Sequence, residues 1–247
     1  MKFDKFKGKK ALSLANLLSA DDFALANELL KADYYYLSYL DDNALDASRH
    51  IKSEIGAASY ALAMLAAYKF DQMEPFKSYD IGHLSGESNI GEEEAQRLAK
   101  WVFETGNEAQ IIIDKSFFAH HDSKFIFSIL SKLGLSVVLA GGADDKSQAL
   151  ANELSSDEVA EPAELESFDG SVVYLYASED AELLRANQSW LSVAKVANEN
   201  ELTLSAKDGF NKTVKVKMDN SIKGTVAMLA TKNITGYNFK LVKVDKA

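Results

Sequence analysis

Three short runs of almost continuous apolar residues constrain the fold of this chain most strongly. They cover residues 109–113, 135–140 and 171–176, and each has the length of a single strand. An amphipathic segment separates the first two runs, and Gly134 lies where the helix in that segment should stop. Strands that are apolar on both faces and alternate with helices are typical of a parallel sheet covered on both sides. The sequence therefore predicts an α/β domain.

Helical periodicity identifies the segments around these strands. Apolar residues recur at helical spacing in 43–68, 90–103 and 122–133, and segment 144–154 has the same amphipathic character. We predict a helix over each of the four. The tyrosine-rich segment 34–39 fits either a short strand or one face of a helix, and the sequence leaves both open.

The pattern changes after residue 186. Five short segments with strand composition follow, separated by Asn, Asp and Gly residues typical of turns: 190–196, 201–206, 213–218, 224–229 and 239–244. Residues 190–247 contain ten lysines and five acidic residues, a net charge of +5, whereas residues 1–189 have a net charge of −15. We predict two domains, an α/β domain over residues 1–188 and a small antiparallel β-barrel over residues 189–247.

A glycine-rich segment, residues 81–94, precedes the second predicted helix. We predict a strand end, a tight turn and then the helix, with Asn89 as its N-terminal cap and Gly91 allowing the bend. Glu92, Glu93 and Glu94 crowd the first turn, where negative charge meets the positive end of the helix dipole. Three consecutive glutamates fan around a helix, so we expect a solvated first turn rather than a carboxylate metal site or an acid–base pair, with contact to a neighbouring subunit as the functional alternative.

Residues 84–94 resemble a Leu-Ser-Gly/Ala-Glu-Ser/Cys-Asn-x-Gly-Glu-Glu-Glu segment of the large iron–sulfur subunit of bacterial NADH:quinone oxidoreductase, in the molybdopterin-oxidoreductase-like C-terminal half of that subunit. Residues 118–120, Phe-Ala-His, match an aromatic-Ala-His step that follows a strand in that family. A third likeness, to the C-terminal barrel of molybdopterin enzymes, involves Val214, Val216, Asp219, Gly224 and Val226.

The resemblance implies a reduced molybdopterin-oxidoreductase-like fold. It also implies a function: a cofactor-free accessory subunit in the peripheral arm of respiratory complex I, non-catalytic by itself within this electron-transport enzyme. The segment that carries the strongest likeness would then serve architecture and partner docking, through Glu87, Asn89, Gly91, Glu92, Glu93 and Glu94.

The residue chemistry argues against a redox centre held by the chain. The sequence has no Cys, which excludes cysteine-ligated clusters and thiolate nucleophiles. His120 and His121 are adjacent, so their side chains should point apart, and we expect a structural role rather than metal binding. Gly141 and Gly142 follow an apolar run and precede a helix, a place where backbone N–H groups hold phosphates, but two aspartates close behind would repel one. We expect no cofactor, no metal and no catalytic residue.

Two other functions stay open on the residues alone. A stand-alone nucleotide- or flavin-binding oxidoreductase would use Gly141, Gly142 and the end of the parallel sheet, and a small protein-binding module would use the acidic surface. The basic C-terminal segment lacks the interleaved aromatic residues of a nucleic-acid surface, so we predict partner subunits and no nucleic acid. Because no run approaches the roughly 20 apolar residues of a membrane span, we expect a cytoplasmic protein, peripheral to the inner membrane through the complex.

Overall fold

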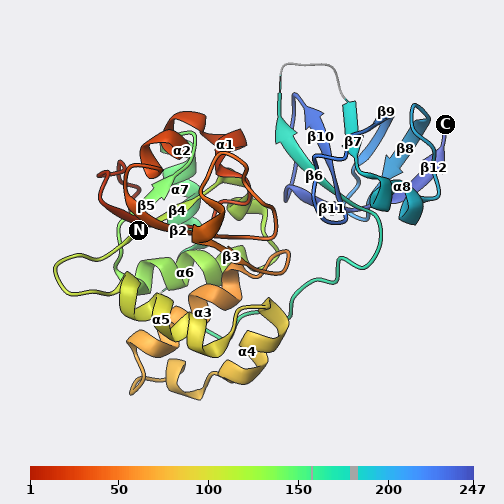
Figure 1. Ribbon diagram of the computed structural model, residues 1–247. Coiled ribbons are helices and arrows are strands. Elements are labelled where there is room, and N and C mark those ends of the chain that lie inside the picture. The colour runs from red at the N-terminus through yellow and green to blue at the C-terminus, as the bar shows by residue number, and fades with distance from the viewer. Residues whose placement is uncertain (157, 179–182) are drawn as a thin grey trace. The chain divides into compact units, whose positions relative to one another are not determined.

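The computed structural model describes residues 1–156, 158–178 and 183–247, which form two compact units (Figure 1). Unit 1 is Met1–Glu166 and unit 2 is Ser167–Ala247. The boundary lies earlier than the predicted 188/189, because the apolar run 171–176 belongs to the sheet of unit 2 rather than to the α/β unit. With this boundary unit 2 has a net charge of +2 and unit 1 of −12, so the contrast in charge is smaller than the predicted boundary suggested.

Unit 1 contains a five-stranded parallel sheet with the strand order β3-β2-β1-β4-β5, which confirms the predicted α/β class. The chain moves outward from β1 to β3 and then returns past β1 to β4, so the order reverses between β1 and β4. The tyrosine-rich segment is a strand, in which Tyr34 and Tyr36 are both buried on one face. The strands are β1 (Lys10–Ser13), β2 (Asp33–Ser38), β3 (His50–Lys52), β4 (Gln110–Ile113) and β5 (Val137–Leu139).

Ten helical segments surround this sheet in the described part of unit 1. They are α1 (Leu18–Asp21), α2 (Phe23–Leu29), η1 (Ala47–Arg49), α3 (Ala58–Lys69), η2 (Phe76–Ser78), α4 (Ile81–Ser88), α5 (Glu92–Val102), η3 (Lys115–Ala119), α6 (Ser123–Leu133) and α7 (Asp145–Leu154). The helices predicted over 90–103, 122–133 and 144–154 are confirmed, and Gly134 ends α6 with a φ of +65°. The helix predicted over 43–68 is wrong before Ala58, because Ile51 pairs with Leu37 as part of β3. Strand pairing at a distance has overridden the local periodicity there.

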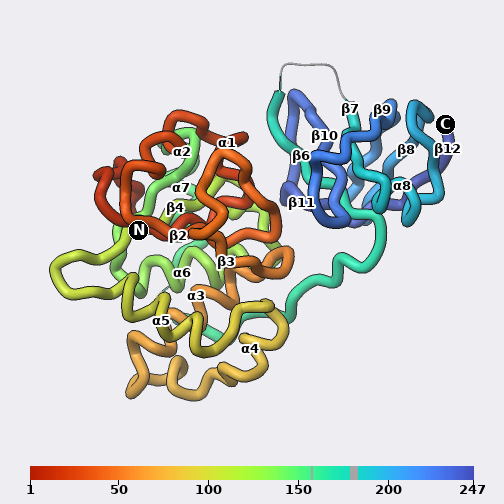
Figure 2. Tube along the Cα trace, in the orientation of Figure 1, coloured from red at the N-terminus to blue at the C-terminus, as the bar shows by residue number. Residues whose placement is uncertain are grey.

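The two faces of the sheet differ in how they are covered. Helices α3, α5 and α6 lie on one face (Figure 2). Their buried residues form one core cluster with alternate strand residues such as Leu12, Ile111 and Ile113. The other face buries Ala11 and Ile112 against residues of α1 and α2. Helix α3 has ten of its twelve residues buried, and its alanines leave room for neighbouring helices to approach closely. Helical periodicity alone did not reveal this burial, since α3 is apolar on all sides.

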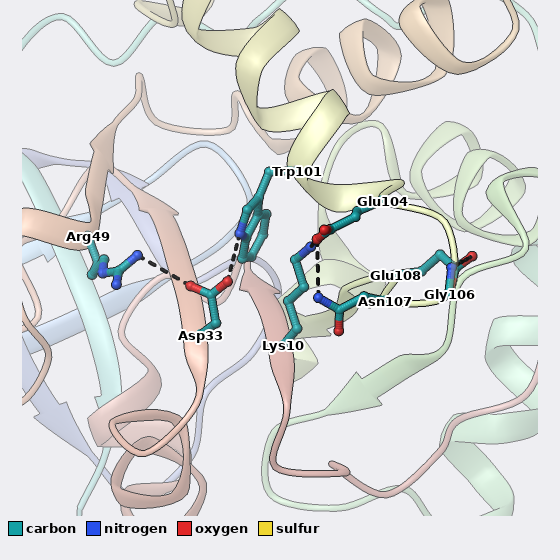
Figure 3. A network of polar contacts seen from close by, with 8 residues as sticks. All are labelled: Lys10, Asp33, Arg49, Trp101, Glu104, Gly106, Asn107 and Glu108. Atoms are coloured by element: carbon teal, nitrogen blue, oxygen red, sulfur yellow. Dashed lines mark hydrogen bonds and ion pairs between the residues drawn. The ribbon is translucent and has the colours of Figure 1, made fainter.

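A polar network fastens the end of α5 to the amino ends of β1 and β2 (Figure 3). Lys10 is buried, and its Nζ lies 2.6 Å from Glu104 Oε2 and 4.7 Å from the centre of the Trp101 ring. Trp101 Nε1 donates to Asp33 Oδ2 at 2.9 Å, and Arg49 lies 3.4 Å from the other oxygen of Asp33. A buried lysine needs such partners, so the network fixes the angle at which α5 meets the sheet.

Unit 2 contains one seven-stranded sheet with the order β11-β6-β10-β7-β9-β8-β12. Its edge strands β11 and β12 are separated in sequence by Val242 alone, so the sheet closes almost into a barrel. The predicted antiparallel arrangement is wrong: β6 pairs with β10 and β7 with β9 in parallel, which makes the sheet mixed. The strands are β6 (Val172–Ala177), β7 (Leu183–Ala186), β8 (Glu201–Ser205), β9 (Asn211–Met218), β10 (Val226–Thr231), β11 (Phe239–Leu241) and β12 (Lys243–Lys246).

Unit 2 also contains a helix where the sequence predicted the strand 190–196. Helix α8 (Gln188–Ala194) begins at Asn187, whose side chain accepts a hydrogen bond from Trp190 N at 2.9 Å. Trp190 is fully buried, and its Nε1 donates to the Val172 carbonyl oxygen at 2.8 Å. The cap and the anchoring of Trp190 in the core therefore outweigh the strand preference of Trp and Val. No helix in the described part of the chain has the length and apolar character needed to span a lipid bilayer.

Candidate functional site

The carboxyl end of the parallel sheet is the place where open α/β sheets hold ligands, at the point where the strand order reverses. In unit 1 this point lies between β1 and β4. The loops after β1, β2, β4 and β5 bring polar side chains and one glycine turn to it. We call this set the sheet mouth: Asn16, Asp21, Asp22, Asp42, Asp114, Lys115 and Gly141.

Asp114 closes the crevice between β1 and β4. This carboxylate is fully buried directly after β4, and its Oδ2 accepts hydrogen bonds from the backbone N of Asn16 at 2.8 Å and from Asn16 Nδ2 at 3.1 Å. Its Oδ1 accepts from Ser116 N at 2.7 Å. Ser38 Oγ, at the end of β2, donates to the Asn16 carbonyl oxygen at 2.6 Å. The polar groups at the ends of β1, β2 and β4 are therefore hydrogen-bonded to one another.

Gly141 and Gly142 form the turn between β5 and α7, with φ values of +75° and +79°. The Gly141 N–H donates to Asp22 Oδ2 at 3.0 Å, and the other oxygen of Asp22 caps α2 by accepting from Leu25 N at 2.9 Å. Asp144 caps α7 by accepting a hydrogen bond from Ser147 N. The amide of Gly141 that a phosphate would use is thus bonded to a carboxylate of the chain.

Asp21 differs from the other three aspartates of the sheet mouth. Asp42 accepts from Ser19 N at 2.9 Å and from Ala44 N at 3.0 Å, so like Asp22 and Asp114 it is held by backbone N–H groups. Asp21 Oδ2 is buried and has no hydrogen-bond partner within the described residues. Burial, followed by the negative charges of Asp114, Asp42 and Asp22, raises the pKa of Asp21 to about 8, and Lys115 opposes this. Asp21 therefore binds its proton more tightly than an exposed aspartate does.

No local pattern in the sequence identified this cluster. Its four acids come from three connections between residues 21 and 114, and only the strand order brings them together. Chemically, the cluster brings four carboxyl groups together: Asp21 has a buried oxygen without a donor among the described residues, and the other three accept backbone N–H groups. Such a site repels phosphate groups, whereas phosphate-binding helix starts present free N–H groups and a positive field.

The histidines after η3 do not point apart as the sequence predicted, because the ring centroids of His120 and His121 lie 4.4 Å apart. His120 is buried, and its Nδ1 lies 3.0 Å from Asp122 N, which can only donate, so the ring proton is on Nε2 and is donated to the Gly56 carbonyl oxygen at 3.0 Å. Burial, more than the neighbouring His121, lowers the pKa of His120 to about 3. Both ring nitrogens are engaged, so His120 has none to offer a metal. Across the described residues, no group of three or more His, Asp or Glu side chains is arranged to hold a metal ion.

The segment 81–94 is built differently from the prediction. Residues 81–88 are helix α4 rather than a strand end, because Asp80 caps them by accepting from His83 N at 3.0 Å. Asn89 is left-handed, with a φ of +59°, and ends α4 instead of starting α5. The N-cap of α5 is Gly91, which has no side chain to accept a hydrogen bond.

The acidic residues of this segment gather at the start of α5. Glu92, Glu93 and Glu94 form the first turn of α5, as predicted, and Glu92, Glu93 and Glu87 are exposed. These four residues, which we call the acidic helix start, present negative charge beside a helix N-terminus that stabilises it.

The left-handed conformation of Asn89 leads to a test by substitution. Asn89→Ser is expected to lower the free energy of unfolding by about 1 kcal/mol, because most side chains with a Cβ are strained at positive φ. Asn89→Gly, the matched control, should change the stability by less than about 0.5 kcal/mol, since glycine adopts this conformation without strain. Urea denaturation of both variants is the measurement. If the serine variant is as stable as the wild type, the left-handed conformation of Asn89 is contradicted and the predicted role of Asn89 as an N-cap is favoured.

Comparison of the sequence with models of known protein families finds no match. Comparison with curated protein sequences finds none either. The likeness of residues 84–94 to the large iron–sulfur subunit of NADH:quinone oxidoreductase therefore rests on the motif residues themselves.

Proposed function

We propose that this protein is a cofactor-free accessory subunit in the peripheral arm of a complex I-type NADH:quinone oxidoreductase. In this proposal its two units correspond to a reduced molybdopterin-oxidoreductase-like α/β part and the small barrel that follows it. The observation that supports the proposal best is the state of the sheet mouth, where side chains of the chain occupy the position in which this architecture holds a ligand.

The hydrogen bonds of the sheet mouth weigh against a nucleotide. A phosphate bound at Gly141 would have to displace Asp22, which also caps α2, and would meet the charge of Asp42 and Asp114. Each buried donor left without a partner costs about 1–3 kcal/mol. A stand-alone oxidoreductase that binds a nucleotide or a flavin here would need to overcome that cost and the repulsion together. Flavin that copurifies with the protein would favour this second function instead.

The acidic helix start is the proposed docking surface for a partner subunit. Negative charge clustered at an exposed helix N-terminus suits a basic surface, and complementary charge guides association and selects the partner. The proposed location, peripheral to the inner membrane, follows from this docking and not from a membrane segment of the chain.

The test is copurification from the cells in which the chain is made. An affinity-tagged wild-type protein should bring down the other subunits of the enzyme from membranes treated with a mild detergent. Charge reversal of Glu92, Glu93 and Glu94 to Lys should reduce the recovery of the other subunits at least about tenfold. The positive charge of the lysines would be repelled by the positive end of the helix dipole and by the basic partner surface. A matched control reverses three exposed acids elsewhere on unit 1, Glu28, Asp71 and Glu153, and should assemble normally.

The outcomes separate the possible roles of the acidic helix start. A wild-type protein that brings down no respiratory subunit contradicts the proposal. If the reversed protein is folded by circular dichroism and assembles normally while quinone reduction is lost, the segment takes part in the reaction, and the non-catalytic assignment is wrong.

A further inference from the structure

Three aspartates act as ties between the loops of the sheet mouth. Asp22 joins the start of α2 to the β5–α7 turn through Gly141 N, and Asp42 joins the loop after β2 to α1 through Ser19 N. Asp114 joins the end of β4 to the end of β1 through Asn16. Each of these carboxylates accepts two or three N–H groups, and such hydrogen bonds favour its anion. Burial nevertheless raises the pKa of Asp114, and the hydrogen bonds from Ser116 and Asn16 oppose that rise.

Asp21 lies among these three anions as the last residue of α1. The charged groups that face it come from every neighbouring element: Asp22 from the cap of α2, Asp42 from the loop after β2, and Asp114 and Lys115 from the turn after β4. Its buried Oδ2 finds no donor among the described residues, so nothing there would stabilise a charge on Asp21. A neutral carboxyl group fits this place, whereas the charges of Asp114, Asp42 and Asp22 each disfavour a charge on Asp21, which is in poor contact with water.

We propose that the sheet mouth is a pH-sensitive closure, in which protonated Asp21 allows α1 to dock between the strand-end loops and ionised Asp21 drives α1 away from them. Ser19 lies in the same helix as Asp21, and Gly141 N donates to Asp22, the residue that follows Asp21. The ties through Ser19 N and Gly141 N would therefore open together. The device depends on the geometry of the mouth alone and is independent of the proposed function.

The direction of the pH effect follows from where the proton is bound more tightly. In the closed mouth the pKa of Asp21 is about 8, above its ordinary value of 3.8, which applies once the carboxyl group is hydrated in the open mouth. Between these two values the closed form binds a proton that the open form has lost. The ratio of closed to open mouth therefore falls by up to about tenfold per pH unit as the pH rises, and it becomes level above the higher value.

Backbone amide exchange of Ser19 and Gly141 measures this opening directly. We expect their protection, corrected for the intrinsic exchange rate, to fall steadily between about pH 5.5 and pH 8 and then to level off, following the roughly tenfold dependence per pH unit. The variant Asp21→Asn carries a neutral side chain of the same shape at every pH, so its protection should stay constant over this range. Asp71→Asn removes one exposed aspartate outside the sheet mouth and should behave as the wild type does.

A second measurement identifies the group that titrates. The ¹³C carboxyl shift of Asp21 should move near pH 8 in the wild type, and a difference titration should show one proton fewer released by Asp21→Asn in that range. The proposal is overturned if the Asp21 carboxyl is already ionised at about pH 6, well below that value. It is equally overturned if Asp21→Asn loses protection with pH as the wild type does.

Discussion

Trp190→Ala is expected to lower the free energy of unfolding of unit 2 by about 3–5 kcal/mol, a large share of the stability of a domain of this size. Trp190 is fully buried in the core of unit 2, so the substitution creates a large cavity. It also leaves the Val172 carbonyl oxygen without its indole donor. Trp190→Phe, which keeps most of the buried area, should cost clearly less.

The two tryptophans make this experiment specific to each unit. In Trp190→Ala the remaining Trp101 lies in unit 1, so its fluorescence follows the unfolding of unit 1 in urea, while far-ultraviolet circular dichroism follows both units. We expect the Trp101 transition to keep its midpoint. A shift of that midpoint together with the loss of unit 2 would contradict the division at residues 166/167.

Asp114→Ala is expected to destabilise unit 1 by about 3 kcal/mol, because it removes the buried acceptor that Asn16 N and Ser116 N share. Urea denaturation, followed by the fluorescence of Trp101, measures this cost. Asp145→Ala removes an exposed aspartate from the first turn of α7 and should cost much less, which makes it the matched control.

The same variant has a consequence for Asp21. Burial is the first cause of the raised pKa of Asp21 and the Asp114 charge is the second, so removing that charge should move the pKa toward its ordinary value. The ¹³C carboxyl shift of Asp21 would then titrate at lower pH. An unchanged titration would mean that Asp114 and Asp21 do not interact, and a stability equal to that of the wild type would show that water replaces the carboxylate without cost.

Elements with a strong local pattern were predictable from the sequence. Helices α5, α6 and α7 follow from amphipathic spacing, and β4 and β5 follow from short apolar runs. Gly134 and Asp144 have the helix-stop and helix-cap roles that their residue types favour. Each of these features depends on residues within a few positions of one another, which is the range over which sequence patterns act.

The incorrect predictions share a physical cause. Segment 43–57 was expected to be helical, yet its Ile51 is held in β3 by pairing with β2, and Trp190 enters a helix because its ring is anchored in the core. Asn89 has the residue type of an N-cap, and only the preceding helix α4 shows that it is a C-terminal residue with positive φ. In the first two cases a distant contact outweighs a local preference of less than about 1 kcal/mol, and in the third the preceding helix does.

The sequence by itself determined the α/β class of unit 1, the change of character toward the C-terminus and the acidic helix start. The tertiary structure alone decided the strand order in both sheets, and with it the boundary at 166/167, the mixed pairing of unit 2 and the sheet mouth. Asp21, Asp42 and Asp114 are far apart along the chain and have no common motif. They meet because β1 lies between β2 and β4, and the burial and mutual repulsion that change the chemistry of Asp21 arise only when these strands are paired.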